Sequence, residues 1–458
     1  MDATSGAVSP LMHELSAYIA SAVDRALPEH VLERAKIHLV DTVAAIVSGS
    51  ALPPGRRAFG YVETLGGRAE CSVFGTRLVT SAVHAAFANG MFAHSDETDD
   101  THPPSRTHPG ASVVPAAFSI GERQSLSGQM VLRALVLGYD ICARLLLAID
   151  ESKFRYTGHH ASSFGGVFGA AAAAACLLRL DAQRVRYVLS YAAEQAAGLY
   201  AMHRDTEHVE KAFAMGGMTA HNGTAAALMV ASGFTGVEDV FSGDRDFFAT
   251  FAPQADRAQL TRGLGSTYEI LRGGIKRWTV GGPIQGPLDV LHRLLQTHRI
   301  DAAHVDRLIV RMPERELETV DGRDMPNICV QHLLAVMLVD GTVTFQSAHD
   351  RSRMHDPAVL AVRARVQALG DPALSDHLRR WRCAMRIVLK DGRELDGETL
   401  SAKGGFDNPL TREDEEAKAV DLIAPVLGGR AAQALIRTMW HFDDVSDVCE
   451  LRPLLVPQ

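Results

Sequence analysis

Residues 165–180, GGVFGAAAAAACLLRL, determine the fold class more than any other stretch of this sequence. Almost every side chain in the segment is small or apolar, so a helix formed by it has no polar face to turn towards water. Residues 217–233, GMTAHNGTAAALMVASG, have the same character. Because small residues allow helices to pack closely, we predict that both segments form central, buried helices.

Helical patterns continue on both sides of these two segments. Residues 31–50 and 129–149 place apolar side chains at helical spacing, and the first of them stops in a Gly/Ser turn. Residues 411–440 return to a helical pattern near the C-terminus. The sequence therefore predicts a large all-helical domain formed by residues 1–265 together with residues 405–458.

The pattern changes in the region between these helical parts. Residues 304–313 alternate apolar and polar side chains as a half-buried strand does. Residues 381–400 contain two extended runs around an Asp-Gly pair, which is a hairpin signal. Residues 266–280 are expected to be extended as well. We predict a smaller α+β domain over residues 266–404, and thus a fold that is mainly α with a smaller α+β domain.

The bulk composition limits the classes of function. The chain has 458 residues, 47% of them hydrophobic, and a net charge of −8 without a basic block, which argues against nucleic acid or an anionic membrane as a partner. No charged-then-apolar leader is seen, so we expect a cytoplasmic protein. The cysteines are scattered without a C-x-x-C pair, which argues against a zinc or iron–sulfur site and favours reduced thiols.

Residues 94–115, HSDETDDTHPPSRTHPGASVVP, concentrate ionisable side chains in a proline-rich connection between two predicted helices. His94, His102 and His108 could bind a divalent cation, but neither H-E-x-x-H nor a short fixed histidine pair is present. Alternatively, the acids cap the following helix, where its dipole favours negative charge. Prolines restrict the backbone of this loop, and restricted loops often hold chemical groups.

Two further segments contain candidate functional residues. In YTGHHASSFGGVFGAAA, residues 156–172, His160 precedes a predicted helix whose free N–H groups would favour a carboxylate ligand. In RDTEHVEKAFAMGGMTAHNG, residues 204–223, Lys211 enters a small, apolar helix. Taken alone, His160 is either a buried structural histidine or an acid/base group, and Lys211 is either a surface-reaching or a functional lysine.

Together these segments resemble the MmgE/PrpD family. The matching stretches occur in the family's order over nearly the whole chain: NGMFAHSDETDDTH, HPGASVVPAAFSIGE, GHHASSFGGVFGAAAAAACLLRLD, EKAFAMGGMTAHNGTAAALMVASGFTG, IKRW, LLAVMLVDGTVTF and NPLTREDEEAK. The resemblance implies a large helical domain, a smaller α+β domain and commonly a homodimer. It also implies an enzyme without metal or organic cofactor that acts on a small di- or tricarboxylate.

The resemblance assigns roles to individual residues of this chain. It implies that the catalytic residues are His108, His160, Lys211 and Glu97. It implies that Asp100, Thr101 and Lys276 help to bind the substrate. The cations would face the substrate carboxylates, and most of the acids must be capped, paired or turned away, because they would otherwise repel the substrate.

The chain departs from the family pattern at several positions. Gln285 stands where a histidine is expected after the lysine strand, and Thr279 replaces a proline. His159 replaces the usual aromatic residue before His160, and His332 lies about where cis-aconitate decarboxylases have a tyrosine. Glutamine binds carboxylates but carries no proton at neutral pH. We therefore expect Gln285, His159 and His332 to contact the substrate, with one of the two histidines in an acid/base role.

The resemblance leaves several reactions open. The family includes 2-methylcitrate dehydratase, iminodisuccinate epimerase and cis-aconitate decarboxylase, which all move a proton at a carbon next to a carboxylate. A hydro-lyase of the 2-methylcitrate dehydratase type is the primary prediction. An epimerase or isomerase, a cis-aconitate-type decarboxylase, and a carboxylate-binding protein without activity are the alternatives.

Overall fold

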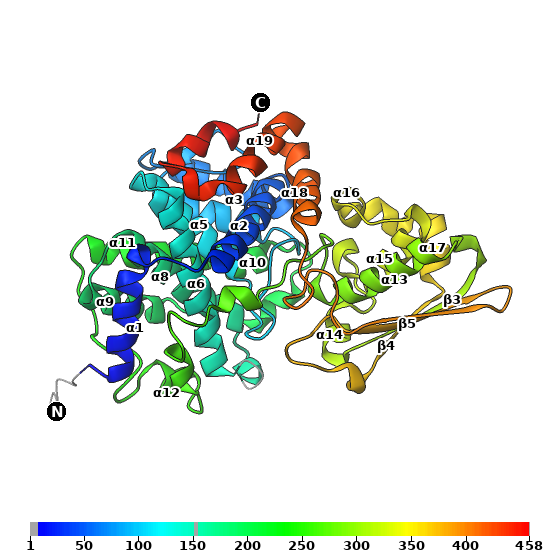
Figure 1. The fold of residues 1–458 in the computed structure, drawn as a ribbon, viewed down its shortest axis with the longest axis horizontal. Helices are drawn as coiled ribbons and strands as arrows, with labels where there is room; N and C mark the ends of the chain where they lie inside the picture. Colours follow the sequence, from blue (N-terminus) through cyan, green and yellow to red (C-terminus); the bar gives the residue numbers. More distant parts are fainter. Residues whose placement is uncertain (1–7, 151–153, 458) are drawn as a thin grey trace. The chain divides into compact units, whose positions relative to one another are not determined.

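The computed structural model describes residues 8–150 and 154–457, which divide into two compact units (Figure 1). Unit 1 consists of the described residues up to Ser95, from Asp100 to Arg272, and from Leu422 onward. Unit 2 takes Asp96–Asp99 and Gly273–Asp421. The return to unit 1 therefore begins at Leu422, later in the chain than the expected residue 405.

Unit 1 is helical, and its core is a set of small-residue helices. Its described α-helices are α1 (Pro10–Ser21), α2 (Glu29–Ser50), α3 (Pro53–Leu65), α4 (Ala82–Ala93), α5 (Pro109–Arg123), α6 (Gly128–Ile149), α8 (Ala161–Leu177), α9 (Ala182–Glu194), α10 (Val209–Ala212), α11 (Met218–Ala231), α12 (Phe247–Phe251) and α19 (Gly429–Trp440), while α18 (Arg412–Leu427) crosses the boundary between the units. Two short strands, β1 (Cys71–Ser72) and β2 (Val79–Thr80), pair beside them.

Helix α8 is the centre of unit 1, as its composition predicted. All of its residues are buried, and α5, α6 and α11 pack around it. The close approach depends on glycine: a Cβ on Gly169 would collide with the carbonyl oxygen of Gly138 in α6. The predicted helices at residues 165–180 and 217–233 are thus confirmed as α8 and α11, but only α8 is buried along its whole length, whereas α11 has buried and half-buried positions.

Unit 2 is an α+β structure built on a four-stranded sheet in the order β4-β3-β5-β6. Strand β3 (Val305–Met312) pairs parallel to β4 (Val366–Gly370) and antiparallel to β5 (Cys383–Leu389), which forms the predicted hairpin with β6 (Glu394–Thr399). Along β5 every second side chain is buried, against α13 (Gln285–Thr297) and α15 (Val330–Asp340) (Figure 1). The remaining helices are α14 (Glu314–Val320), α16 (Phe345–His349) and α17 (Pro357–Arg363).

The prediction of an extended segment over residues 266–280 is wrong. The segment contains a 3-10 helix, η6 (Glu269–Arg272), and no strand among its residues, all of which the structure describes. Buried polar contacts override the strand-like composition, because the Glu269 amide donates to Asp140 Oδ1 at 2.6 Å. Its carboxylate lies 3.2 Å from His102 Nε2. Sequence alone also missed β4, which is short and pairs with a strand distant in the chain.

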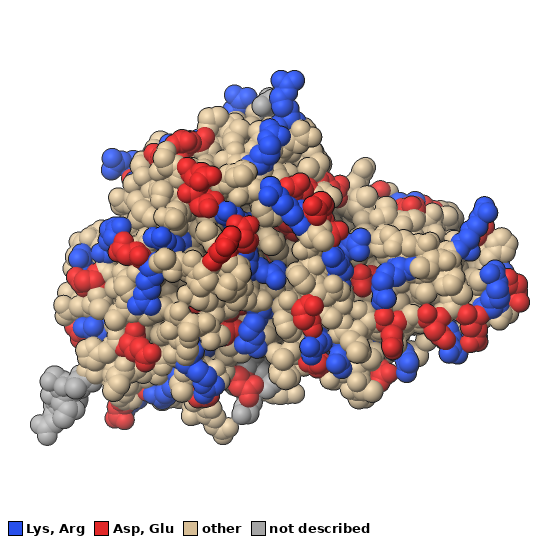
Figure 2. Space-filling model, in the orientation of Figure 1, with Lys and Arg blue, Asp and Glu red and all other residues tan. Residues whose placement is uncertain are grey.

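Three further features bear on the sequence-based expectations. No single described helix is long and apolar enough to cross a membrane, and α2 and α3 pass that test only as a pair, bent by 79°. The six cysteines are free thiols, as predicted. Acidic and basic side chains alternate over the face shown in Figure 2 without a large block of one sign.

Candidate active site

Two predicted catalytic histidines lie at the beginnings of two neighbouring helices of unit 1. His108 is the residue before α5, and His160 is the residue before α8. The His108 amide donates to Ser162 Oγ in the first turn of α8 at 3.1 Å, which ties the two helix starts together. Both histidines are half-buried. Helix N-termini carry free N–H groups and positive partial charge, so an anion is favoured beside both rings.

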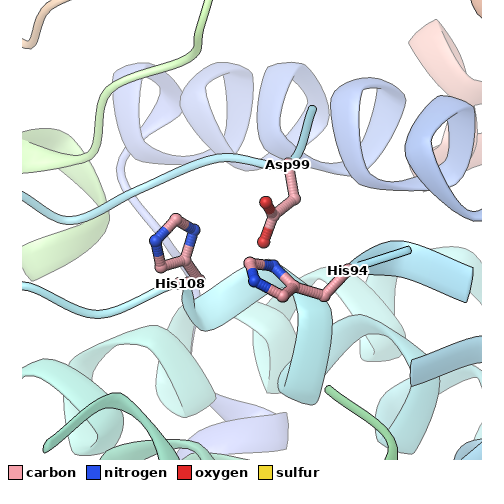
Figure 3. A group of neighbouring side chains, drawn as sticks. All are labelled: His94, Asp99 and His108. Carbon is pink, nitrogen blue, oxygen red and sulfur yellow. The ribbon is translucent and has the colours of Figure 1, made fainter. Parts of the chain in front are cut away.

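Further imidazole rings gather around these two. His94, at the end of α4, has its ring centroid 5.1 Å from that of His108 and 5.3 Å from that of His208. Figure 3 shows the His94 and His108 rings side by side. The ring centroid of His203 lies 5.3 Å from that of His160. These five histidines and Lys211, which is described next, are called the histidine cluster below.

Lys211 enters the histidine cluster from a distorted helix. It lies in α10, which continues into a π-helical turn, Phe213–Gly217, before α11. A π-helical turn is rare and is often found at functional sites. The turn packs closely against α4, since a Cβ on Gly216 would collide with the Gly90 carbonyl oxygen. The small-residue packing therefore fixes the position of the helix that carries Lys211.

The positive charge of the cluster acts on His160. Burial first, and then the charges of His203, Lys211, His108 and His94, hold the pKa of His160 well below its ordinary value of 6.5. At neutral pH the ring is therefore neutral and able to accept a proton. Gathering cationic groups lowers stability unless an anion is bound among them, so the cluster has the character of a binding site.

Asp100, a predicted substrate-binding residue, has three hydrogen-bond partners within unit 1. His38 Nδ1 lies 2.6 Å from Asp100 Oδ2, and the Tyr139 hydroxyl donates to the same oxygen at 2.7 Å. The amide of Gly110, in the first turn of α5, donates to Asp100 Oδ1 at 3.1 Å. These contacts make Asp100 a buried cap of α5, as the capping interpretation expected; its part in substrate binding stays a prediction.

His102 does not join the histidine cluster. Its Nδ1 lies 2.7 Å from Ser105 Oγ, and its Nε2 lies 3.2 Å from Glu269 Oε2. Both ring nitrogens of His102 therefore have partners within the fold. The metal site considered from the sequence, with His94, His102 and His108 as ligands, does not form. Thr101, predicted to bind substrate, donates through Oγ1 to the Thr107 carbonyl at 3.3 Å and closes the same loop.

The segment Asp96–Asp99, called the acidic segment below, is held by cations of unit 2. Lys276 Nζ donates to the Glu97 carbonyl oxygen at 2.9 Å and lies 3.5 Å from Asp99 Oδ1 and 4.0 Å from Glu97 Oε2. Lys418 Nζ donates to the Thr98 carbonyl oxygen at 3.2 Å. Two lysines of unit 2 thus contact the acidic segment, and one of them, Lys276, faces both the Glu97 and the Asp99 carboxylates. The predicted roles of Glu97 in catalysis and Lys276 in substrate binding stay predictions.

Asp96 completes this arrangement through an ion pair. His349 Nε2 lies 2.8 Å from Asp96 Oδ2. Burial opposes ionisation of Asp96, but the close His349 imidazole and the hydrogen bonds from Thr98 outweigh it and lower the pKa of the carboxyl. Burial likewise opposes protonation of His349, but Asp96 outweighs it and raises the pKa of the imidazole above its ordinary value. Both partners are therefore charged at mildly acidic pH, between the lowered pKa of Asp96 and the raised pKa of His349.

Gln285, where the family pattern expects a histidine, is engaged by the backbone of unit 2. Its Oε1 accepts from the Trp278 amide at 3.0 Å, and its Nε2 donates to the carbonyl oxygens of Trp278 at 2.9 Å and Val280 at 3.1 Å. The side chain is 1% exposed. The amide therefore fixes the loop after Lys276, and its predicted contact with substrate stays a prediction.

His332 and His159, which were expected to replace the histidine absent at position 285, lie in different surroundings. His332 is fully buried in α15, and neither ring nitrogen has a hydrogen-bond partner among the residues that the structure describes. Burial lowers the pKa of His332 to about 4. His159 stacks on Phe154 with ring centroids 5.1 Å apart and meets Phe164 and Phe251 edge-on. His159 thus packs as the aromatic residue that it replaces.

Sequence reasoning missed two members of the histidine cluster, His203 and His208. Both lie in an irregular stretch just before Lys211, where hydrophobic periodicity gives no signal. His208 has φ +62°, a left-handed conformation that is uncommon for a residue other than glycine and often marks a functional position. The available signal was the repeated histidine within YAMHRDTEHVEK.

Comparison with known proteins decides the family. The model of the MmgE/PrpD N-terminal domain matches residues 13–259, and the model of the MmgE/PrpD C-terminal domain matches residues 278–444. The chain belongs to the MmgE/PrpD family. Family membership and the helical unit with its smaller α+β unit confirm the predicted family and fold class.

Several relatives of this MmgE/PrpD chain carry names that state an activity. A cis-aconitate decarboxylase-like protein, oryM, of Aspergillus oryzae is 26% identical, with 96% of each chain covered. Cis-aconitate decarboxylases of Homo sapiens and Aspergillus terreus are each 24% identical, with 94% and 99% of this chain and 91% and 97% of theirs covered. These names agree with the prediction of an enzyme of the lyase class.

Proposed function

We propose that this protein is a cofactor-independent carboxy-lyase that removes CO2 from cis-aconitate or a closely similar small polycarboxylate. The observation that carries the proposal is the histidine cluster of unit 1, in which His108 and His160 lie at the starts of α5 and α8 and the charge of Lys211 in α10 acts on His160. The names of the relatives support decarboxylation among the reactions of the family.

The proposed chemistry starts with binding of the carboxylates by the cluster. Lys211 and the N–H groups of the two helix starts supply positive charge, and the negative substrate favours protonation of the neighbouring imidazoles. A bound anion therefore raises the pKa of His160 towards its ordinary value. The same binding removes the repulsion among the cationic groups of the cluster.

The reaction then needs one bond broken and one proton delivered. One substrate carboxylate leaves as CO2, and the electron pair of the broken C–C bond passes into the carbon chain conjugated with a second carboxylate. Lys211 and His108 stabilise the negative charge that develops there. Protonated His160 gives its proton to carbon, which completes the product and leaves a neutral imidazole.

The other reactions considered from sequence use the same first contacts. Dehydration of a 2-methylcitrate-like hydroxy acid was the primary prediction, but none of the relatives named above is called a dehydratase. Epimerisation and binding without turnover have no specific observation in their favour. A cytoplasmic location and a homodimer stay predictions.

Proton NMR of the purified protein in heavy water tests the proposal. The substrate panel holds cis-aconitate, citrate, 2-methylcitrate and iminodisuccinate, and released CO2 is measured in parallel. We expect cis-aconitate to lose CO2 and to gain one deuterium at carbon. Water elimination from 2-methylcitrate without CO2 release would contradict the proposal in favour of the dehydratase, and exchange without elimination would favour the epimerase.

A further inference from the structure

Two backbone segments of unit 1 are joined so that His160 and His203 are held as one piece. The His160 amide donates to the Gly198 carbonyl oxygen at 3.0 Å, and the Tyr200 amide donates to the Gly158 carbonyl oxygen at 2.9 Å. His159 and Leu199 form an isolated antiparallel bridge between the same segments. The 3-10 helix that begins at Tyr200 and carries His203 is therefore anchored on the loop that carries His160.

The side chains extend this backbone connection. The His203 ring packs on Tyr200 with a centroid separation of 4.4 Å and approaches His160 to 5.3 Å between centroids. At that separation one water can bridge a nitrogen of one imidazole to a nitrogen of the other. Among the described residues, His160 Nδ1 has no hydrogen-bond partner, and His203 Nε2 is buried although the residue as a whole is only half-buried.

We propose that His203 is a proton-relay residue that resupplies His160 during turnover. The inference rests on the proposed function and deepens it. When His160 gives its proton to carbon, its neutral ring takes a proton from the His203 imidazolium through one bridging water. His203 then takes a proton from solvent, so one proton enters from water for each CO2 released, and no oxidant or metal is needed.

Chemical rescue of the His203→Asn enzyme tests the relay. We expect kcat for CO2 release to fall by about 10²-fold with little change in KM, since the group acts on proton transfer and not on binding. Added imidazole buffer should restore most of the lost rate, and buffers of other pKa should restore it in proportion to their strength as proton donors. If His203 only packed against its neighbours, added buffer would not restore the kcat of the variant.

The controls separate the relay from folding and from the proposed function. His203→Gln provides a second variant of different shape, with the same loss and rescue expected. His221, half-buried in α11 and 3.0 Å from Asn222 Oδ1, is the matched control, and His221→Asn should keep the wild-type kcat without a buffer effect.

Three results would overturn the relay while leaving the proposed function intact: unchanged kcat in both His203 variants, a loss that imidazole does not restore, or a change confined to KM. Wild-type protein that releases no CO2 from any tricarboxylate would instead overturn the proposed function, and the relay with it.

Discussion

The acidic segment of unit 2 and the histidine cluster of unit 1 both concentrate ionisable side chains, but in opposite ways. In the acidic segment carboxylates face cations: Asp96 pairs with His349, and Lys276 lies between Asp99 and Glu97. In the histidine cluster, groups of the same sign meet one another, and their charges lower the pKa of His160. Opposite charges stabilise the fold, whereas a group of like charges favours the binding of an oppositely charged ligand.

This difference resolves the tension raised by the sequence, in which the acids of residues 96–100 would repel a polycarboxylate. Asp96 pairs with His349, Asp99 lies beside Lys276, and Asp100 has three hydrogen-bond partners, so these acids have partners within the fold. The comparison teaches that a charge-rich motif divides into structural and functional parts according to its partners, which composition does not reveal.

The largest effect is expected for the cation of the histidine cluster. Lys211→Met removes positive charge opposite the substrate, so kcat/KM for CO2 release should fall by about 10³-fold. Steady-state kinetics with cis-aconitate measure it. Lys390→Met, at an exposed position on unit 2, is the matched control and should behave as wild type. Equal activity of the Lys211→Met and Lys390→Met variants would show that Lys211 takes no part in the reaction.

The next effect concerns the stability of unit 2. His349→Phe leaves the Asp96 carboxylate buried without its cation, which should cost about 3 kcal/mol of unfolding free energy. The pKa of His349 is raised, so its contribution is present at low pH and is lost as pH rises through that pKa. The pKa of Asp96 is lowered, so its contribution is lost as pH falls through that value.

Denaturant unfolding at several pH values measures this difference, which should be largest near pH 5–6, between the two pKa values. The exposed His304–Asp301 pair provides a control, and His304→Phe should leave the midpoint of unfolding unchanged. Identical curves for His349→Phe and wild type would show that the acidic segment does not depend on its partner, contrary to the comparison.

A smaller effect is expected for His332, which is buried outside both charge groups. Its folded pKa of about 4 lies below the unfolded value, so the unfolded chain binds the extra proton and stability falls as pH drops from 6.5 towards 4. His332→Leu should remove a part of this loss of unfolding free energy at acidic pH, of the order of 2 kcal/mol. Unfolding midpoints at pH 7 and pH 4.5 test this, and an unchanged pH dependence would contradict it.

The smallest effect is expected for His159, which packs on Phe154. His159→Phe keeps the aromatic contacts, so both stability and kcat should stay close to wild type, with a change below about 1 kcal/mol. Thermal unfolding and CO2 release measure the two quantities. A large loss of kcat with normal stability would assign His159 the acid/base role that its packing argues against.

The sequence supports much of the fold because composition and periodicity act locally. The small residues of α8 and α11 and the alternation along β5 determine what each element buries. Residues 266–280 were mispredicted because their conformation depends on buried contacts of Glu269 with distant residues. His203 and His208 escaped prediction because they lie in irregular backbone, where only three-dimensional proximity shows that His203 lies beside His160 and His208 beside His94.

The most direct test of the central claim is a histidine-ring NMR titration with cis-aconitate, with signals assigned by single His→Asn variants. We expect the signals of His108, His160 and His203 to move on binding, and His160 to become protonated at a higher pH with cis-aconitate than without it. His38 and His102, whose partners lie within the fold, should keep their signals. Turnover with an unchanged cluster, or equal shifts at His38 and His102, would contradict the claim.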